Sequence, residues 1–274
     1  MIGLGSNRLT IARRGGMSVT QTGRGGMEWL AGGRVPSWAS PYSAQATAAL
    51  KAQFPTQWPT ILDYGFAHPA LVPFINEDPM LVMSLIEGLG ERWITCDKKA
   101  FIQTPFLASK NLGYRIRSKS NSLGTNTIIY GGIANVRLGL SYYTSLYSYV
   151  THYNNTYHVK SNFPDQMVWH TFEQNIEIGK FKVDGTTYET WTWNTNAEGG
   201  NMHVPTEYIG ERPDSDISFF EFWDNQTQTM LGRFVPCKHK VNGELEAGWL
   251  DIVSAVWYGN IYSEGQFTIS ESPA

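Results

Sequence analysis

The chain has 274 residues, of which 42% are hydrophobic, 14% are aromatic and only 16% are charged, and it contains 27 glycines. This composition is typical of all-β proteins, in which many short strands alternate with glycine-rich turns. A net charge of −3 and a pI near 6.1 give no electrostatic case for nucleic-acid binding, and no apolar run is long enough to span a membrane.

The first 40 residues or so combine glycine pairs with five arginines against a single acidic residue, Glu28. Paired glycines disfavour the interior of helices and strands because they lose the most backbone entropy on ordering. The segment also lacks the continuous apolar stretch of a secretory signal peptide. Two interpretations stay open, a flexible basic tail and an arm that orders against a partner. The arm is favoured by scattered apolar side chains that need burial, namely Met17, Met27, Trp29, Leu30 and Trp38.

A short helix is predicted over residues 43–52, which are rich in helix formers and begin with a possible cap at Ser43. Pro55 ends it. The proline-rich residues 55–79 predict an extended connector without a core of its own. We therefore place a domain boundary near Asp78, with residues 1–77 as an attachment arm and residues 78–274 as a β domain.

Short strands dominate the pattern after residue 80. Residues 136–142 alternate apolar and polar side chains with the period of two that a half-buried strand requires. Breaks at glycine and asparagine pairs come at the spacing of an antiparallel sandwich. Further strands are predicted over Leu85–Glu87, Arg92–Cys96, Tyr114–Lys119, Asn126–Tyr130, Asn135–Tyr143, Leu146–His152 and Thr156–Lys160.

Residues 217–223 are apolar on both faces, with Phe219 and Trp223 on one and Phe220 and Phe222 on the other. This pattern predicts either a central strand or a strand that packs on another chain.

Two cysteines, Cys96 and Cys237, are too few for a disulfide-built scaffold and lack the Cys-x-x-Cys spacing of a zinc site. We predict that both are reduced, with a bond between neighbouring strands as the alternative. No metal and no other cofactor is expected.

The segment Trp169-His170-Thr171-Phe172, followed by Lys182-Val183-Asp184-Gly185, predicts two strands of which the second ends in a tight hairpin turn. This pair resembles the central hairpin of laminin-G-like, concanavalin A-type jelly rolls. Other segments resemble strands of the same family in the same order, over residues 81–270, in the versions that phage tail and prophage proteins carry. They are Leu85–Gly88, Trp93–Thr95, Tyr208–Gly210, Ile217–Asp224, Arg233–Cys237, Leu250–Val253 and Trp257–Asn260.

The resemblance implies an all-β, antiparallel jelly-roll sandwich, preceded by an extended N-terminal arm with a short helix. It also implies that the indole of Trp169 is buried. It implies no calcium ligands, because no Asp/Asn pair of this sequence aligns with the metal loops of the family.

Some sandwiches of this kind hydrolyse glycosides with two carboxylates on one strand, as Glu-x-Asp-x-x-Glu. The sequence has no such run. Glu221 and Asp224 project to opposite faces, and Glu244 and Glu246 lie in a turn-rich stretch. We therefore expect no catalytic residues, and we expect His170 to serve in packing and hydrogen bonding.

Trp191 and Trp193 are one residue apart, so on a strand both side chains lie on one face, with Tyr188 on the other. On an exposed face they form a platform for stacking a sugar, with Asn194 and Asn196 as hydrogen-bonding neighbours. Between the sheets they are core residues, which the composition of a sandwich favours.

The expected function is that of a non-enzymatic phage virion protein, assembled in the host cytoplasm, with an outward lectin-like domain. Its expected partners are other virion proteins, bound through the N-terminal arm, further copies of the chain, and a cell-surface glycan, with neither nucleic acid nor membrane. The alternatives are a glycan-binding receptor-recognition protein, a glycoside hydrolase and a bacterial surface adhesin.

Overall fold

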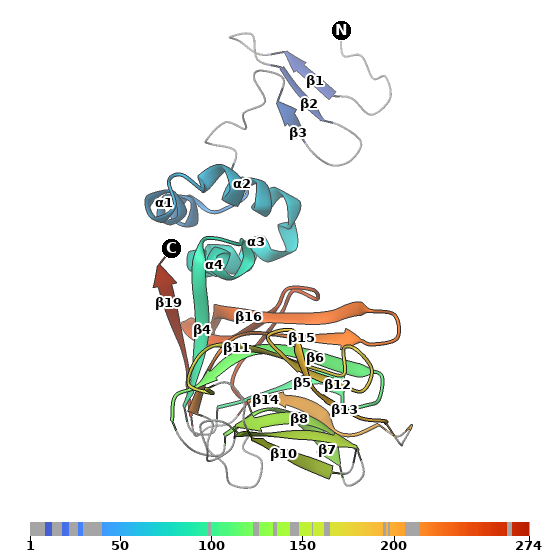
Figure 1. Cartoon of the computed structure of the whole chain (residues 1–274). Helices are drawn as coiled ribbons and strands as arrows, with labels where there is room; N and C mark the ends of the chain where they lie inside the picture. The colour runs from blue at the N-terminus through green and yellow to red at the C-terminus, as the bar shows by residue number, and fades with distance from the viewer. Residues whose placement is uncertain are drawn as a thin grey trace.

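The structure is a computed structural model. It describes three short strands among the first 39 residues and then residues 40–97, 100–122, 126–133, 136–142, 148–154, 156–161, 165–193, 196, 198–205, 214–261 and 265–273. Figure 1 shows a helical segment above a large sheet, with a second sheet below it.

The N-terminal strands β1 (Leu9–Ala12), β2 (Ser18–Gln21) and β3 (Met27–Trp29) pair in order as an antiparallel sheet. Side chains in this part of the chain lie outside the described residues. The attachment of this arm to a partner therefore stays a prediction.

A run of helices follows, and its first member confirms the predicted short helix. Ser43 caps α1 (Ala44–Gln53) by accepting a hydrogen bond from the backbone N–H of Ala46. The other helices are α2 (Trp58–Ala67), η1 (Pro69–Leu71), α3 (Val72–Glu77), η2 (Pro79–Leu81) and α4 (Val82–Leu85).

The predicted extended connector over residues 55–79 is wrong, as is the strand predicted over Leu85–Glu87. Four of these helices carry a proline at their first or second position. Proline is tolerated there because the first backbone N–H groups of a helix have no partner inside the helix. The same prolines that stop one helix therefore begin the next.

Two antiparallel sheets form the sandwich and confirm the predicted all-β jelly roll. The large sheet runs β13-β12-β11-β6-β15-β16-β17-β18, and β4 joins it beside β15 and carries β19. Its strands are β4 (Gly90–Asp97), β6 (Leu112–Ser120), β11 (His170–Gln174), β12 (Lys180–Val183), β13 (Thr186–Thr190), β15 (Asp214–Asp224), β16 (Thr229–Val241), β17 (Glu244–Asp251), β18 (Val256–Tyr258) and β19 (Phe267–Pro273).

The second sheet runs β10-β9-β8-β7-β14-β5. Its strands are β5 (Ile102–Leu107), β7 (Asn126–Ile133), β8 (Val136–Tyr142), β9 (Ser148–Asn154), β10 (Thr156–Ser161) and β14 (Asn201–Val204). The predicted strands from residue 114 to residue 160 all appear here or in the large sheet.

The predicted Asp-Gly turn is confirmed between β12 and β13. Asp184 and Gly185 have φ angles of 48° and 79°, and positive φ at both central residues is the geometry of a type I′ hairpin turn.

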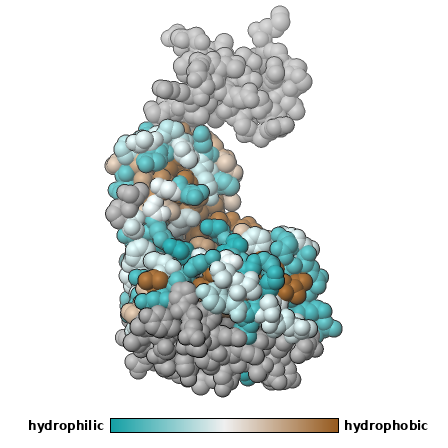
Figure 2. Space-filling view, viewed as in Figure 1, coloured by the Kyte–Doolittle hydropathy of each residue, from teal (hydrophilic) through white to brown (hydrophobic). Residues whose placement is uncertain are grey.

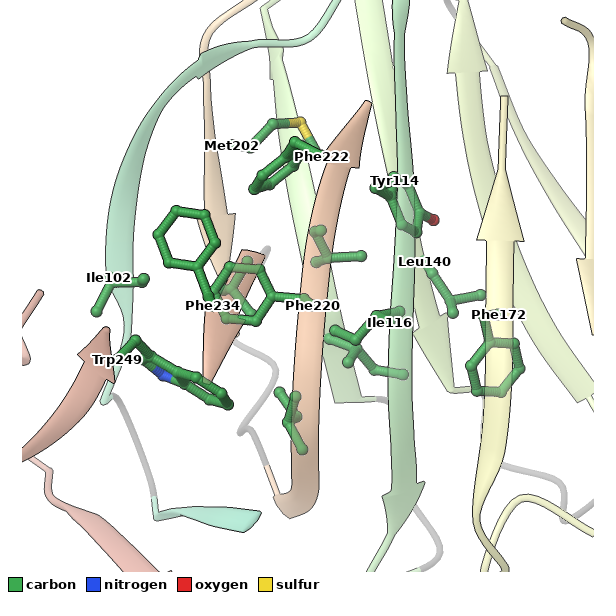
Figure 3. Close-up of a cluster of buried hydrophobic side chains, with 14 of the residues drawn as sticks. Ile102, Tyr114, Ile116, Leu140, Phe172, Met202, Phe220, Phe222, Phe234 and Trp249 are labelled. Carbon is green, nitrogen blue, oxygen red and sulfur yellow. The ribbon is translucent and has the colours of Figure 1, made fainter. Parts of the chain in front are cut away.

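The main core lies between the sheets, and β15 runs through its centre with β6 on one side and β16 and β4 on the other. Phe220 stacks on Phe234 with ring centres 4.5 Å apart, and Trp249 packs edge-on against Phe220 (Figure 3). Phe219 is only partly buried and packs with the helices instead. The prediction of a central strand with two apolar faces is confirmed.

A second core joins the helices to the outer face of the large sheet. Leu50, Ile61 and Ile75 of the helices pack with Val235 and Leu250 of the sheet. The helical segment therefore shares its core with the sheet.

The predicted boundary at Asp78 falls inside this packed region. Asp78 is 5% exposed, pairs with the guanidinium of Arg92 at 2.9 Å and accepts a hydrogen bond from the backbone N–H of Lys238. A boundary requires few contacts across it, so residue 78 is not a division between units. Cys96 and Cys237 are both free and buried, as predicted for reduced cysteines.

Candidate functional site

A cleft of about 780 Å³ lies between the end of the helical segment and the outer face of the large sheet. One wall is the chain from Met83 to Arg92, and the other comes from β6, β15, β16 and the residue that follows β17, Ile252. Figure 2 shows hydrophobic surface at the angle between the helical segment and the sandwich. The volume is within the range of small-molecule sites in proteins.

Strand alternation decides which side chains reach the cleft. On β6, Tyr114, Ile116 and Ser118 are buried, whereas Arg115 and Arg117 between them are half-buried. Successive side chains of a strand point to opposite faces, so these cations lie on the outer face. A bulge between Ile217 and Phe219 shifts the register of β15, and Ser218 and Phe219 both line the cleft.

The three arginines that the structure places in the cleft wall each have a carboxylate partner. Arg117 Nε donates to Glu91 Oε1 at 2.8 Å, and a guanidinium nitrogen of Arg233 donates to Glu221 Oε1 at 2.7 Å. Arg92 is held by Asp78. The guanidinium of Arg233 also lies over the ring of Phe219, 5.0 Å from its centre.

Glu221, a carboxylate that the sequence does not predict to be catalytic, is 1% exposed, and both its oxygens accept hydrogen bonds. Arg115 and Arg233 donate to its two oxygens, and the indole N–H of Trp223 donates to it at 3.0 Å. Its role in the sheet is to hold two cations. Asp224 accepts hydrogen bonds from the backbone N–H groups of Thr227 and Gln226 in a turn. These bonds, and the one from Thr227 most of all, lower the pKa of its carboxyl.

Two tryptophans lie beside the cleft on the same face. Trp93 and Trp169 pack edge-on with ring centres 5.9 Å apart, and the charged groups of Arg117 and Lys119 lie 5.4 and 5.5 Å from the centre of the Trp169 ring. Trp169 is half-buried, so the expectation of a buried indole is wrong. It precedes β11, where it covers part of the outer face instead of the core.

The predicted sugar platform lies elsewhere, after β13, and stays a prediction. Trp191 and Trp193 follow β13 outside any strand, and both pack against the main core. Both indoles are half-buried. Asn196 is exposed and accepts a hydrogen bond from the ammonium of Lys110. Asn194 lies outside the described residues.

His170 has the structural role that the sequence predicted. It is 5% exposed, its Nδ1 lies 2.6 Å from Asp184 Oδ2, and its Nε2 lies 2.9 Å from the backbone oxygen of Asp165. Both ring nitrogens are engaged, and the ring fixes the turn of the hairpin.

Sequence reasoning missed the residues of the cleft. Its available signal was the run Arg115-x-Arg117-x-Lys119 on β6, which places three cations on one face of a strand. No acidic residue lies close to them in sequence, so the sequence could not predict their partners, which only the pairing of the strands brings near.

Within the part of the chain that the structure describes, no three His, Cys, Asp or Glu side chains come together as a metal site. Over the same residues, no helix has the length and apolar character that crossing a membrane requires.

No family model and no curated protein matches the sequence. Solved structures do match it. A SAP-like heptameric pentraxin from Limulus polyphemus has a TM-score of 0.38 at 14% identity, over 51% of this chain and 78% of that one. A beta-1,3-glucanase from Mycobacterium marinum has a TM-score of 0.31 at 14% identity, over 48% and 74%. The binding domain of botulinum neurotoxin DC in complex with SialylT has a TM-score of 0.32 at 11% identity, over 51% and 45%.

These matches correct the expected function. We expected a non-enzymatic phage virion protein, but several of the similar structures are named glycosyl hydrolases or beta-glucanases. These names contradict two of our expectations, that the protein is not an enzyme and that it has a structural role in a virion. We retain neither expectation. The location in a virion, the attachment through residues 1–77 and the homo-oligomer stay predictions.

Proposed function

We propose that this protein binds carbohydrate in the cleft between residues 83–92 and the outer face of the large sheet. The observation that supports the proposal is the lining of the cleft, which combines the Arg117–Glu91 ion pair and the guanidinium of Arg233 with an aromatic and aliphatic floor. Such a lining offers many hydrogen bonds and an apolar surface at once. A sugar ring has the complementary character, because its hydroxyls both donate and accept and its C–H faces are apolar.

The pairing of the charges favours a neutral ligand. A phosphate or carboxylate ligand is best bound by arginines that have no other partner. Arg117 and Arg233 are already neutralised by Glu91 and Glu221. A hydroxyl can donate to the partly exposed carboxylate of Glu91 and accept from a guanidinium of the cleft without breaking the pair, so a neutral polyol costs the site no charge separation.

Apolar side chains complete the site. Phe219, Val235 and Ile252 line the same cleft, and Phe219 and Ile252 are partly buried against the second core. This core holds them in place, so the floor is formed before a ligand arrives. A preformed cleft lowers the entropy that binding must offset.

The test is a screen of the purified full chain on an array of neutral and acidic glycans, followed by calorimetry with the best ligand. Glu91→Gln keeps the shape of the side chain and removes its charge. A hydrogen bond to a charged group contributes roughly 1.5–3 kcal/mol, so Glu91→Gln is expected to weaken binding by about tenfold or more. The matched control is Glu177→Gln, an exposed carboxylate on the turn between β11 and β12 that pairs with lysines in the same way.

The same incubations are analysed for released reducing ends, because binding and cleavage would occupy the same cleft. A chain that binds no neutral glycan on the array contradicts the proposal. So does Glu91→Gln if it binds as tightly as the unchanged protein.

A further inference from the structure

We infer that the carbohydrate is a chain of several sugar units, which leaves the cleft across β6 and passes over Trp93 and Trp169. This inference rests on the proposed function and extends it from a site for one or two units to an elongated site.

Arg117 makes the cleft and the tryptophan pair one surface. Its Nε bonds to Glu91 in the cleft, and the same guanidinium lies 5.4 Å from the centre of the Trp169 ring. Trp169 in turn packs against Trp93 of β4. A ligand held by Glu91 and Arg117 is therefore already adjacent to the indoles.

Among the described residues, the outer face next to the cleft is covered on one side and open on another. Towards β16 and β17 it is covered by the helices, which bury Val235, Cys237 and Leu250 in the second core. Towards β6 and β11 the outward side chains Arg115, Lys119 and others stay half-buried. A ligand longer than the cleft can therefore extend over β6 and the tryptophans.

The charges along this path are compensated as they are in the cleft. Lys119 pairs with Asp216 at 3.2 Å, and Asp216 also accepts hydrogen bonds from Thr95 and Asn121. The path therefore repeats the pattern of the cleft, in which a cation and its carboxylate stand next to an aromatic ring. A neutral polysaccharide has complementary chemistry along its whole length, whereas a strongly anionic or cationic chain would have to compete with each pair.

Half-buried indoles suit this role. Trp93 and Trp169 pack against each other, and each keeps part of its surface exposed. Aromatic side chains that combine a fixed position with exposed apolar surface are typical anchors of binding sites.

The test measures how affinity depends on ligand length. Laminari-, cello- and chito-oligosaccharides of two to six units are titrated into the full chain by calorimetry. An aromatic contact contributes enough for about a tenfold change in affinity, so the hexamer of the preferred series is expected to bind about tenfold more tightly than its dimer. Trp169→Ala is expected to weaken binding of the hexamer more than binding of the dimer, and so to abolish this difference.

Trp58→Ala is the matched control. Trp58 is also half-buried and lies under a cation, with Lys51 Nζ 5.0 Å from its ring centre, but it belongs to α2 and does not line the cleft. It is expected to leave the Kd of every ligand unchanged. Trp169→Leu, which keeps an apolar contact, replaces Trp169→Ala if the alanine variant does not fold.

Three results overturn the inference and leave the proposed function intact. They are an equal Kd for all lengths, an equal loss for dimer and hexamer in Trp169→Ala, and a Trp58→Ala effect as large as that of Trp169→Ala. Binding of no oligosaccharide and of no glycan on the array removes the proposed function, and the inference falls with it.

Discussion

The ion pair between Asp78 and Arg92 joins the helical segment to the large sheet, and its removal is the sharpest test of how this protein is held together. The side chain of Arg92 has no exposed surface, and Asp78 is 5% exposed. One guanidinium nitrogen of Arg92 donates to Asp78 at 2.9 Å and the other at 3.3 Å, and the backbone N–H of Lys238 donates to the same carboxylate at 2.8 Å.

Asp78→Ala leaves the buried charge of Arg92 with two partners, the backbone oxygen of Pro236 at 3.3 Å and the carboxylate of Glu271 at 3.0 Å. Removal of one partner of a buried pair costs about 3–5 kcal/mol. Because Glu271 still compensates part of the charge, we expect a loss near the lower limit, about 3 kcal/mol in the free energy of unfolding. Urea denaturation of the full chain, followed by tryptophan fluorescence, measures it.

The double variant Asp78→Ala, Arg92→Met distinguishes charge burial from simple loss of contacts. Without the cation there is no uncompensated charge, so the double variant is expected to be more stable than Asp78→Ala alone. Glu177→Gln, in an exposed ion pair, serves as control and is expected to cost less than about 1 kcal/mol. The reasoning is refuted if Asp78→Ala costs no more than this control, or if the losses of the two single substitutions add up in the double variant.

Three further predictions concern separate features of the chain. Ser43→Ala removes the cap of α1 and is expected to cost about 1 kcal/mol in the same urea experiment, whereas Ser43→Asp should cost little. Burial raises the pKa of the Cys96 and Cys237 thiols, so neither is expected to react with a thiol reagent at neutral pH until the protein is denatured. A mass spectrum that shows labelling of the native chain, or a linked peptide pair, would contradict this. Burial lowers the pKa of His203 from its ordinary 6.5, so the unfolded chain binds the proton more readily than the folded chain. The free energy of unfolding is therefore expected to fall as the pH drops below 6.5, and His203→Gln should reduce that fall. An unchanged pH dependence in the variant would argue against this reasoning.

The sequence by itself determined the strands of the sandwich and its central hairpin. Alternation along residues 136–142 and the two apolar faces of residues 217–223 are local patterns, and each reports directly which faces of a strand are covered. The Asp184-Gly185 turn was readable for the same reason, because a type I′ turn needs positive φ at two adjacent residues. The cap at Ser43 was readable as well, because the backbone N–H that it binds belongs to Ala46, only three residues further along the chain.

Local patterns failed where one residue type suits two structures. Proline fits an extended connector as well as the first turn of a helix, so Pro59, Pro69 and Pro73 did not reveal the helical segment. Trp169 and Phe172 are three residues apart, so on a strand they lie on opposite faces, and the sequence alone did not say which of the two faces the core. Only the packed sheet shows that it lies against Trp93 on the outer face.

The candidate site is a product of tertiary structure. Arg117 finds Glu91 26 positions away, and Arg115 finds Glu221 106 positions away. These pairs exist because β4 and β6 both pair with β15 in a defined register. A shift of β6 by one residue would point its outward cations, Arg115, Arg117 and Lys119, into the core. Alternation along β6 determined that three cations share a face. Strand order and the helices that cover β16 decided which carboxylates meet them and where a cleft remains open.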